Sequence, residues 1–320
     1  MTNVLVTGGA GYIGSVVSRF LEEQGYKVFI LDNLSTGNIW AVEKDFFQED
    51  IQNTGRVEEI LRHNNIEAVL HFAAFSQVGE SVNDPGKYYS NNVGGTLSLL
   101  TAMVRAGCSK LVFSSTAAVY GNPVQIPINE EHPLQPVNPY GKSKLFVEEI
   151  ILDFSNTYDL SAVIFRYFNA AGSYKSKGEW HKPETHLIPN IFLANVNKRP
   201  FYLFGDDYDT DDGTCIRDFI NVEDLARAHY LGLEHLTHHQ GTEIFNLGTG
   251  KGYSVRQVTE EAKNFLPRPL EVKIESRRKG DPPVLVADYK KANKILGWEP
   301  QISLTDSIRQ CFEYLTEKSE

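Results

Sequence analysis

Cysteine is scarce in this chain. Of its 320 residues only Cys108, Cys215 and Cys311 are cysteines, far apart and without a paired spacing, which favours a reducing compartment over a disulfide framework. Long apolar runs are also missing, and none approaches the roughly 20 residues that a membrane-spanning helix needs. The first strand-like run starts at Asn3, so we expect no signal peptide. Together these absences predict a cytoplasmic protein.

Positive charge is the second shortage. Lys and Arg total 31 against 41 Asp and Glu, which gives a formal net charge of −10. Nucleic acids and anionic membranes both need a basic surface, so we expect neither as a partner. A small anionic ligand stays compatible with local arginines or helix N-termini. The nine histidines are scattered, and the adjacent His238 and His239 cannot share a helical face, so we expect no metal site.

Short runs of β-branched and aromatic residues alternate with helix-like segments over the first half of the chain. They are apolar at nearly every position and cover residues 3–7, 27–31, 68–72, 111–115 and 162–167. This pattern is typical of strands buried on both faces of a parallel sheet. Helical periodicity around Val16 and around Leu97 predicts crossover helices between them. The sequence therefore predicts an α/β fold with a Rossmann-type doubly wound sheet, whose ligands bind at the carboxyl ends of the strands.

The strongest single motif is VTGGAGYIG, which follows the first strand-like run. It spaces Gly8, Gly11 and Gly14 three residues apart, between a strand and a helix. Two of these glycines permit a tight turn close to a pyrophosphate, and the third lets the helix pack near the strand. The next run ends in Asp32, whose carboxylate would bind ribose hydroxyls and repel a 2′-phosphate, which favours NAD over NADP. A glycine turn that binds nothing is the alternative.

A tyrosine and a lysine lie four positions apart in NPYGKSK, residues 138–144. On a helix Tyr140 and Lys144 share a face and can touch. Idle pairs do the same, so the spacing alone leaves open whether Tyr140 is an acid/base or a surface residue.

The glycine spacing together with Tyr-x-x-x-Lys resembles the extended short-chain dehydrogenase/reductase superfamily. Further segments are similar to those of the UDP-glucose 4-epimerases, which interconvert UDP-glucose and UDP-galactose; they are HFAAFSQVGESV, NNVGGT, SSTAAVYG, RYFNAAG, NLGTG and RRKGDPPVLVAD. The resemblance runs from Val4 to about Trp298, nearly the whole chain.

The resemblance implies a tightly held NAD and a reaction at C4 of the sugar. Tyr140, as phenolate, would take the proton of the 4-hydroxyl while the C4 hydride passes to NAD, and the 4-keto sugar would turn over and receive the hydride on its other face. Lys144 would stabilise the phenolate and hold the cofactor ribose. Thr116 would bond the same sugar oxygen, although a strand-end threonine can also be satisfied by the backbone alone.

The resemblance also implies the remaining contacts. For the cofactor, besides the glycines, Tyr140 and Lys144, they are Tyr12, Ile13, Asp32, Asn33, Asp50, Ile51, Phe72, Asn91 and Phe168. For a UDP-hexose substrate, besides Thr116 and Tyr140, they are Asn169, His186, Leu187, Arg217, Arg278, Asp281 and Leu285. The planar fork of arginine suits phosphate oxygens, although Arg217 and Arg278 could each form a structural ion pair instead.

Three positions qualify the resemblance. Ser76 stands where the family often has a lysine that reaches the nicotinamide ribose, and Asn221 stands where it usually has a histidine. Leu285 matches a position that gates the sugar 2-substituent; leucine is intermediate between the tyrosine of strict glucose/galactose enzymes and a small residue that admits N-acetylhexosamines. Acceptance of UDP-N-acetylglucosamine therefore stays open.

The chemistry after the 4-keto intermediate separates the related enzymes. Dehydratases carry an Asp-Glu pair after the serine or threonine of the SST segment, and decarboxylases a glutamate, whereas this chain has Thr116-Ala117-Ala118. Without a second acid/base the ketose can only take the hydride back, which favours epimerisation. The alternatives are a 4-epimerase of UDP-xylose, UDP-glucuronate or N-acetyl sugars, a dehydratase, and a dinucleotide-sensing regulator without catalysis.

The second half of the chain is less regular, with Pro183, Pro189 and Pro200 and a charged loop. We expect an NAD-binding domain over residues 1–172, with a return segment near 218–240, and a smaller C-terminal α/β domain over 173–320 that mainly binds the UDP-sugar. The segment from Leu145 to Phe154 is apolar over more than one helical face. Since the family pairs this helix and the preceding one across a two-fold axis, we expect a homodimer.

Overall fold

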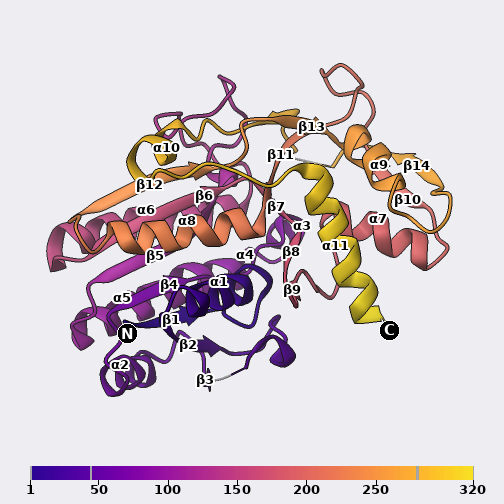
Figure 1. Ribbon diagram of the computed structural model, residues 1–320. Coiled ribbons are helices and arrows are strands. Elements are labelled where there is room, and N and C mark those ends of the chain that lie inside the picture. The colour runs from indigo at the N-terminus through magenta and orange to yellow at the C-terminus, as the bar shows by residue number, and fades with distance from the viewer. Residues whose placement is uncertain (1, 44, 279–280, 320) are drawn as a thin grey trace.

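The computed structural model describes residues 2–43, 45–278 and 281–319 (Figure 1). Its largest unit is a sheet of seven strands in the order β12-β6-β5-β4-β1-β2-β3, and every neighbouring pair is parallel. The strands are β1 (Asn3–Thr7), β2 (Lys27–Asp32), β3 (Phe46–Gln48), β4 (Ala68–His71), β5 (Lys110–Thr116), β6 (Ser161–Tyr167) and β12 (Thr242–Leu247). The predicted Rossmann-type doubly wound sheet is confirmed.

Burial on both faces explains why the five predicted runs form the centre of this sheet. All of β4 and β6 is buried, and β-branched and aromatic residues fill both of their faces. The sheet continues beyond the predicted runs at both edges. β3 extends it next to β2, and β12 returns from the second half of the chain to pair with β6, from Thr242 opposite Ala162 to Leu247 opposite Tyr167.

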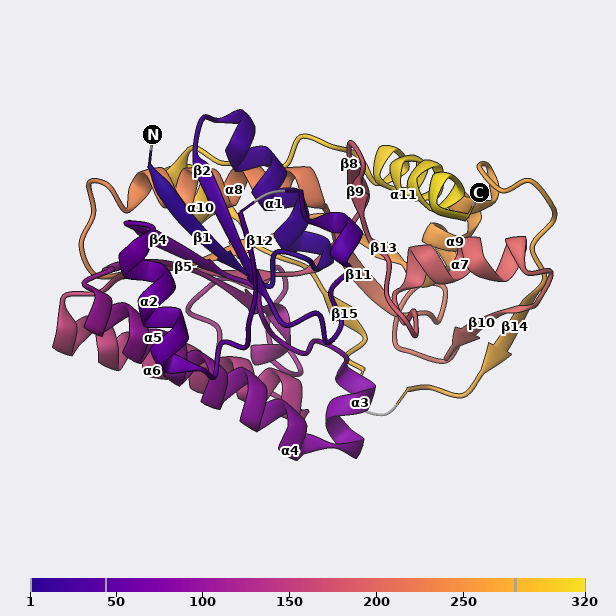
Figure 2. The same cartoon turned by 90° about the horizontal axis from the view of Figure 1, so that it is seen from below.

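Two helical layers cover the sheet. α1 (Tyr12–Glu23) and α8 (Val222–His235) share one apolar core with it, while α2 (Thr54–His63), α5 (Gly95–Ala106) and α6 (Pro139–Tyr158) share the core on the other face. Figure 2 shows α8 on one side of the strands and α2, α5 and α6 on the other. α10 (Lys290–Leu296) packs beside β12 and α8. Residues from both ends of the chain therefore build this unit.

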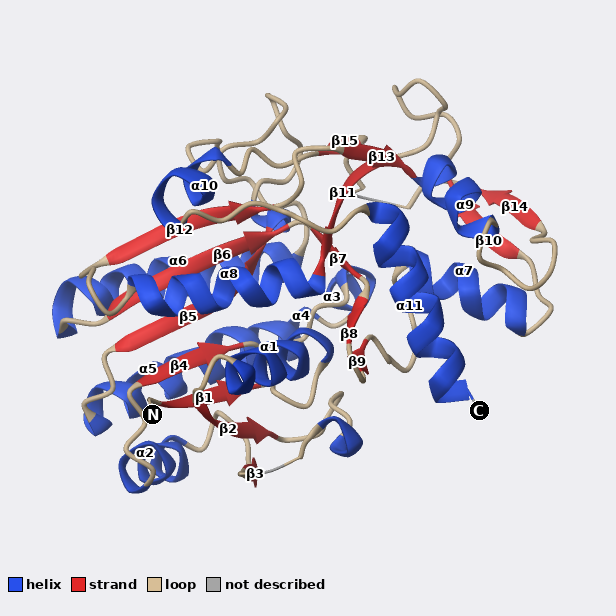
Figure 3. Cartoon of the chain, in the orientation of Figure 1, coloured by secondary structure: helices blue, strands red, loops and turns tan. Residues whose placement is uncertain are grey.

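A second, smaller group of elements lies beyond the carboxyl ends of the strands (Figures 1 and 3). Its core is formed by α7 (Leu187–Val196), α9 (Val255–Lys263) and α11 (Leu304–Ser319). Short strands surround them: β7 (Asn169–Ala171), β8 (Ser173–Tyr174), β9 (Lys177–Gly178), β10 (Phe201–Phe204), β11 (Ile216–Asn221), β13 (Gly252–Ser254), β14 (Val272–Glu275) and β15 (Val284–Leu285). Two short helices, α3 (Val78–Asn83) and α4 (Pro85–Tyr88), follow β4.

Asn221, one of the departures from the family pattern, joins the two groups. Its Oδ1 accepts a hydrogen bond from Glu223 N at 2.8 Å and caps α8, while its Nδ2 donates to Ser307 Oγ at 2.9 Å and Gln310 Oε1 at 2.8 Å on α11. Asparagine therefore serves both as helix cap and as a tie between α8 and α11. Over the part of the chain that the structure describes, none of the helices has the length and apolar character to cross a bilayer.

Candidate active site

The turn between β1 and α1 fits a dinucleotide phosphate. Gly8 has φ +72°, and a Cβ there would lie 2.6 Å from Ala73 N; a Cβ on Gly14 would lie 2.3 Å from the Gly8 carbonyl oxygen. Only glycine fits at either position. α1 begins after Gly11 without a side-chain cap, so the backbone N–H groups of its first turn remain available to an anion.

Asp32 lies at the end of β2 with 7 % of its surface exposed. Its Oδ2 accepts Ala10 N at 3.0 Å and its Oδ1 accepts Leu34 N at 2.8 Å. Burial raises the pKa of Asp32, and the two backbone bonds oppose that rise. Each carboxylate oxygen keeps a lone pair for a further donor, so Asp32 suits ribose hydroxyls. The glycine turn and Asp32 together fit NAD.

Further predicted cofactor residues lie along the same edge of the sheet. Asn33 Nδ2 donates to Asp50 Oδ2 at 2.9 Å, which links the ends of β2 and β3. Phe72 follows β4 directly, and Phe168 follows β6 and is buried. Ile51 has a different environment: its side chain is buried under α5, where a Cβ on Gly95 would lie 2.7 Å from it, so the side chain serves packing.

Tyr12 and Ile13 form the first turn of α1. The Tyr12 hydroxyl donates to Gly172 O at 2.7 Å and so fixes the start of α1 against the segment that follows β7. Asn91 lies in a π-helical turn, η2 (Tyr89–Gly94), and its Nδ2 donates to Asn92 Oδ1 at 3.0 Å. Ser76, the other departure from the family pattern, is exposed.

Tyr140 and Thr116 meet at the carboxyl edge. Thr116 is the last residue of β5, and Tyr140 lies in the first turn of α6. Burial raises the pKa of Tyr140, and a hydrogen bond from the Thr116 side chain acts in the opposite direction. The Tyr140 ring also lies edge-on to Tyr88, with centroids 6.4 Å apart. Thr116 and Tyr140 therefore lie close enough together to contact the same hydroxyl group of a bound substrate.

The start of α6 explains how Tyr140 comes so close to β5. Asn138 is the N-cap and accepts Gly141 N at 2.9 Å, and Pro139 occupies the first helical position. A Cβ on Gly141 would lie 2.6 Å from the Ala118 carbonyl oxygen. Gly141 thus permits the close packing of α6 on η3 (Ala117–Val119), directly after Thr116.

Lys144 lies one turn further along α6. Its Nζ donates to Ser114 O at 2.7 Å and sits 4.8 Å from the centre of the Phe113 ring. Burial lowers the pKa of Lys144 to about 7, and the negative charge of Glu148 opposes this shift. In the described structure the Lys144 ammonium is bonded to the β5 backbone, and its predicted role in stabilising a phenolate at Tyr140 stays a prediction.

A buried ion pair supports this helix. Arg166 Nη2 lies 2.6 Å from Glu148 Oε2, and both side chains are only 2 % exposed. Ser115 Oγ donates to the same carboxylate, and Arg166 Nη1 donates to the Tyr120 hydroxyl at 3.0 Å. The network connects α6 to the ends of β5 and β6. Sequence analysis missed it because its members lie far apart along the chain.

A second buried network, also missed, starts at His71. Its ring nitrogens lie 2.7 Å from Thr7 Oγ1 and 2.8 Å from Thr96 Oγ1, and burial lowers the pKa of His71 to about 3. Asn92 Nδ2 donates to Ser143 Oγ at 3.0 Å on α6. The π-helical turn thus connects the strand ends to the Tyr140 helix. HFA and NNVGGT are the motifs that contain His71 and Asn92.

Some predicted substrate residues gather on β11 and β15. Arg217 pairs with Leu285 in the parallel β11–β15 ladder, and its Nη2 lies 3.8 Å from Asp281 Oδ1. Leu285 packs on the apolar cluster that contains Ala117 and Phe168, which brings it to the catalytic end of β5. Asn169 is exposed at the start of β7.

Asp218, which sequence analysis did not single out, holds this region together. It is fully buried and accepts hydrogen bonds from Thr249 N at 2.7 Å, Thr249 Oγ1 at 2.6 Å, Gly250 N at 2.9 Å and Ala287 N at 3.1 Å. Its neighbour Arg217 drew attention as a phosphate ligand, whereas the role of Asp218 depends on partners far along the chain.

His186 and Arg278 lie near each other in the smaller group of elements. His186 precedes α7 as its N-cap residue, Leu187 begins that helix, and the Arg278 guanidinium lies 4.2 Å from the centre of the Phe204 ring. The negative charges of Glu179 and Glu184 raise the pKa of His186, whose side chain is half-exposed, and the positive charge of Arg278 opposes the rise. Cationic groups are therefore available where a diphosphate is expected.

Comparison with known proteins agrees with this geometry. The model of the NAD dependent epimerase/dehydratase family matches residues 4–248. A UDP-glucose 4-epimerase of Halalkalibacterium halodurans is 49% identical over 302 residues, which are 93% of this chain and 90% of the relative. Among solved structures, the UDP-glucose 4-epimerase from Brucella ovis in complex with NAD is 45% identical, covers 98% of both chains and has a TM-score of 0.94.

A second solved structure extends the comparison to a nucleotide sugar. It is the UDP-glucose-4-epimerase from Stenotrophomonas maltophila with bound NAD and formylated UDP-arabinopyranose, 39% identical, with a TM-score of 0.96 and coverage of 100% of this chain and 99% of that one. The chain therefore belongs to the NAD dependent epimerase/dehydratase family, within the extended short-chain dehydrogenase/reductase superfamily.

Proposed function

We propose that this protein is a UDP-glucose 4-epimerase, which interconverts UDP-glucose and UDP-galactose at tightly bound NAD. The observation that carries the proposal is the end of β5. Thr116 ends that strand, and its side chain opposes the rise that burial causes in the pKa of Tyr140 at the start of α6, while the next residues, Ala117 and Ala118, offer no ionisable group. Epimerisation requires one acid/base side chain at C4 of the sugar and no second acid/base side chain nearby.

NAD would supply the hydride acceptor and a positively charged nicotinamide ring. The glycine turn and the uncapped start of α1 would hold its pyrophosphate, and Asp32 would receive the ribose hydroxyls. Asn33, Asp50, Phe72, Asn91 and Phe168 are the other proposed cofactor contacts, together with Tyr12 and Ile13 in α1.

Tyr140 is the proposed acid/base. Its Oη would accept the proton of the sugar 4-hydroxyl and return it to the same oxygen after the 4-keto sugar has turned over, so no net proton is consumed. Because burial raises the pKa of Tyr140 in the protein alone, the phenolate needs the Thr116 hydrogen bond and the charge of the bound cofactor. Lys144, anchored on Ser114 O, would hold the cofactor ribose and add positive charge.

The UDP portion of the substrate would be bound by the smaller group of elements, beyond the carboxyl ends of the strands of the large sheet. Arg217 and Arg278 are the proposed diphosphate ligands, with His186, Leu187 and Asn169 beside them. The Arg217–Asp281 separation of 3.8 Å is too long for a close ion pair, and Arg217 Nη1 donates to Ile216 O at 2.9 Å, so the Nη2 side of the guanidinium remains available to a phosphate. On this basis residues 1–172 with the return segment bind NAD, and the remainder mainly binds the UDP-sugar.

Assembly, location and pathway complete the proposal. We infer a homodimer, a cytoplasmic location and a role in galactose metabolism. The dimer is supported by the surface of α5 and α6, where Leu97, Phe146 and Leu152 are 45%, 44% and 37% exposed. Apolar side chains of this size on two neighbouring helices suit a self-complementary two-fold contact.

The test is incubation with UDP-galactose, followed by NMR of the sugar with and without added NAD. We expect UDP-glucose to form without added cofactor and with no net NADH. Tyr140→Phe should stay folded and loaded with NAD and lose about 10²- to 10⁴-fold in kcat, since general acid/base catalysis contributes on that scale. A stable keto product would place the protein among the dehydratases, and wild-type turnover by Tyr140→Phe would remove Tyr140 from the mechanism.

A 4-epimerase of another UDP-sugar is the second candidate, and Leu285 is the observation that favours it. Leu285 lies on the cluster with Ala117 and Phe168 and is smaller than the tyrosine that restricts the sugar 2-position. UDP-N-acetylgalactosamine from UDP-N-acetylglucosamine, at a rate near that of the glucose pair, would establish dual specificity. Leu285→Tyr should then abolish the N-acetyl reaction and spare the other.

A further inference from the structure

The loop between β9 and α7 concentrates four potential metal ligands that the epimerase chemistry does not need as a set. Glu179, His181, Glu184 and His186 each offer one ligand atom, and these atoms all lie within 4.8 Å of one another. In the sequence they form Glu-x-His-x-x-Glu-x-His over eight residues, GEWHKPETH including the preceding glycine. The prediction of no metal site, made from the scattered histidines and from His238 and His239, missed this spacing.

The distances within the cluster suit a single small cation. His181 Nδ1 lies 3.0 Å from Glu179 Oε1 and 3.9 Å from Glu184 Oε2, and His186 Nδ1 contacts Glu179 Oε1 and lies 3.9 Å from Glu184 Oε1. Ligands about 2.0–2.2 Å from a tetrahedral zinc lie roughly 3.4 Å from one another. The four side chains therefore need only small rotations to surround one ion.

Burial and charge make this cluster compatible with a divalent cation. The Glu179 and Glu184 side chains are only 2% and 6% exposed, so two carboxylates are withdrawn from water side by side. Buried charges need a counter-charge or a metal. Both histidines direct Nδ1 toward the carboxylates. The ligand set of two imidazoles and two carboxylates matches Zn²⁺ and similar divalent transition metals better than Mg²⁺, which prefers oxygen ligands and water.

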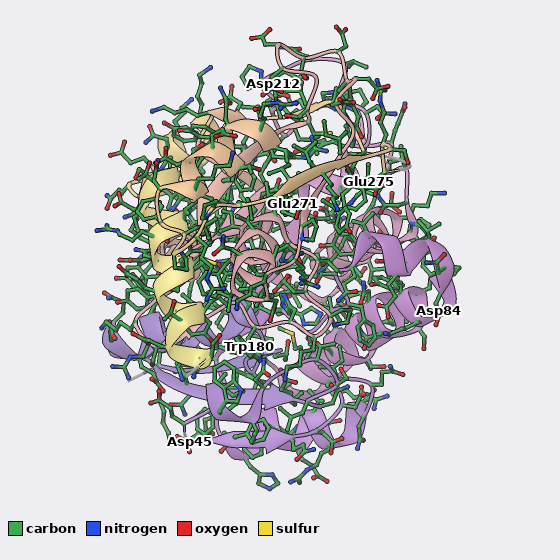
Figure 4. All side chains as sticks on the ribbon, turned by 90° about the vertical axis from the view of Figure 1, so that its right-hand side faces the viewer. Asp45, Asp84, Trp180, Asp212, Glu271 and Glu275 are labelled. Carbon is green, nitrogen blue, oxygen red and sulfur yellow. The ribbon has the colours of Figure 1, made fainter. Side chains whose placement is uncertain are left out.

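The cluster lies between the two halves of the fold. Trp180, between the first two ligands, packs on the core of the smaller group, and its carbonyl oxygen accepts Asn38 Nδ2 at 3.1 Å from the loop after β2. Figure 4 shows Trp180 beside the end of α11. The His181 ring lies edge-on to Tyr12, with centroids 6.5 Å apart. An ion here would hold the loop of residues 179–186, which contacts Tyr12 of α1 through His181 and leads directly into α7.

We propose that Glu179, His181, Glu184 and His186 bind one divalent transition-metal ion, with Zn²⁺ as the preferred occupant, and that this ion orders residues 179–187 against the nucleotide-binding unit. Coordination through His186 Nδ1 leaves Nε2 free to face the substrate diphosphate. The metal on Nδ1 and the diphosphate on Nε2 would together fix the orientation of the imidazole ring, because a metal-bound imidazole is commonly oriented by a partner on its other nitrogen. The metal site stands independently of which UDP-sugar the enzyme converts.

The first experiment measures metal content. Full-length protein purified without a metal-affinity tag is dialysed against EDTA and then equilibrated with Zn²⁺ or with Mg²⁺, and bound metal is counted by mass spectrometry. We expect about one Zn²⁺ per chain at low micromolar free metal and no Mg²⁺ at the same concentration. Replacement by Co²⁺ should give the visible absorption of a four-coordinate site. Less than about one-fifth of an equivalent of Zn²⁺ would overturn the proposal.

Variants locate the ion. His181→Ala and Glu179→Gln should each lose the bound Zn²⁺ and the Co²⁺ absorption, and neither residue is in the proposed catalytic or substrate set. The matched control is His239→Ala, because the His239 ring, just beyond the end of α8, stacks on that of His235 at 4.6 Å and the two could take up Zn²⁺ as a histidine pair outside the proposed site. Loss of Zn²⁺ in His239→Ala with retention in His181→Ala would place the ion elsewhere and overturn the assignment.

Thermal unfolding gives an independent readout that does not depend on activity. Since a ligand that binds only the folded state stabilises it, saturating Zn²⁺ should raise the Tm of wild type and His239→Ala by at least about 3 °C. The Tm values of His181→Ala and Glu179→Gln should not respond, and circular dichroism with NAD content verifies that both variants are folded. An equal Zn²⁺ response in all four proteins would contradict the proposal.

Discussion

At the scale of single residues, burial in the candidate active site opposes the ionisation of its titratable side chains. Tyr140, Lys144 and His71 are all deeply placed at the carboxyl edge, and burial shifts each pKa toward the neutral form: upward for the phenol, and down to about 7 and about 3 for the amine and the imidazole. The protein alone therefore keeps the site nearly neutral. A positively charged cofactor would change this balance, so we expect the proposed acid/base function of Tyr140 to depend on cofactor occupancy.

Gly141→Ala tests whether close packing positions Tyr140. A Cβ at Gly141 would lie 2.6 Å from Ala118 O and 3.1 Å from Pro136 Cβ, so the start of α6 must move away from β5. Displacing a reacting group by about 1 Å can cost roughly 10²-fold, and we expect a loss of that size in kcat with NAD content unchanged. Steady-state kinetics on UDP-galactose measures it.

Gly55→Ala on α2 is the matched control, because no heavy atom lies within 4 Å of the Cβ it would add. Helix propensity favours alanine over glycine by about 1 kcal/mol in a helix interior, so both variants gain from that effect alone. Wild-type kcat in Gly141→Ala would show that Tyr140 does not need this contact.

The stability of the protein should fall in mild acid because of His71. Its pKa is about 3 in the folded protein and 6.5 in an unfolded chain, so between these values the unfolded state binds a proton that the folded state does not. The free energy of unfolding then decreases by about 1.4 kcal/mol for each pH unit that is lost. His229, with a pKa lowered to about 4 by burial, acts in the same direction.

Urea denaturation of wild type and His71→Gln at several pH values between 5 and 6.5 measures this effect. Glutamine cannot take up the proton, so the slope of unfolding free energy against pH should decrease by about one proton in the variant. The pH window lies above the range in which Glu179, with a folded pKa of about 2 against 4.5, contributes. Identical slopes in the two proteins would show that His71 is charged in the folded state.

At the scale of elements, a strand or helix could be predicted from the sequence where its own residues form a recognisable pattern. The five central strands were predictable because β-branched and aromatic residues fill both of their faces. β12 was not, since its pairing with β6 joins Thr242 to Ala162 across a long stretch of chain. The apolar stripe of α11, with Leu304, Ile308 and Leu315, was readable at helical spacing and was passed over.

The same distinction applies to the candidate site. Tyr140 and Gly8 were predicted because short motifs of neighbouring residues contain them. Asp218 and Arg166 were missed because their partners come from other elements, and no local pattern identifies which buried charge will meet which donor. The Ser114 anchor of Lys144 was missed for that reason as well.

The ion pair between α6 and β6 gives a prediction at this scale. Arg166→Met leaves Glu148 buried with only the Ser115 hydrogen bond of its former network, and loss of one partner of a buried pair costs roughly 3–5 kcal/mol. Urea denaturation should show a loss of that size. The double variant Arg166→Met/Glu148→Gln should recover part of it, since no uncompensated charge remains.

A double-mutant cycle over these two positions separates the pair from packing. Additive effects of the two substitutions would contradict the interaction, and so would an Arg166→Met protein as stable as wild type. Because Glu148 also opposes the lowering of the Lys144 pKa, its replacement should leave Lys144 less charged near neutral pH. This ion pair therefore connects the stability of α6 to the charge state of the site.

At the scale of the whole molecule, the exposed face of α5 and α6 predicts a dimer. Phe146, 44% exposed, contacts the Tyr89 ring at 6.0 Å from the π-helical turn, and Leu97 is 45% exposed on the neighbouring helix. In a two-fold contact each residue appears twice, so one substitution introduces two charges into the interface. Phe146→Glu should therefore give a monomer at micromolar concentration by light scattering, whereas we expect the wild type to be a dimer.

Val124→Glu is the control for that experiment, because Val124 is 81% exposed on a loop away from both helices and should leave the dimer intact. Proposed site residues lie at the starts of the same helices: Tyr140 is in the first turn of α6, and η2 before α5 contains Asn91. If the contact stabilises both helix starts, the Phe146→Glu monomer should also release NAD faster than the wild-type dimer. A wild-type monomer under these conditions, or a Phe146→Glu dimer, would show that this face has another role.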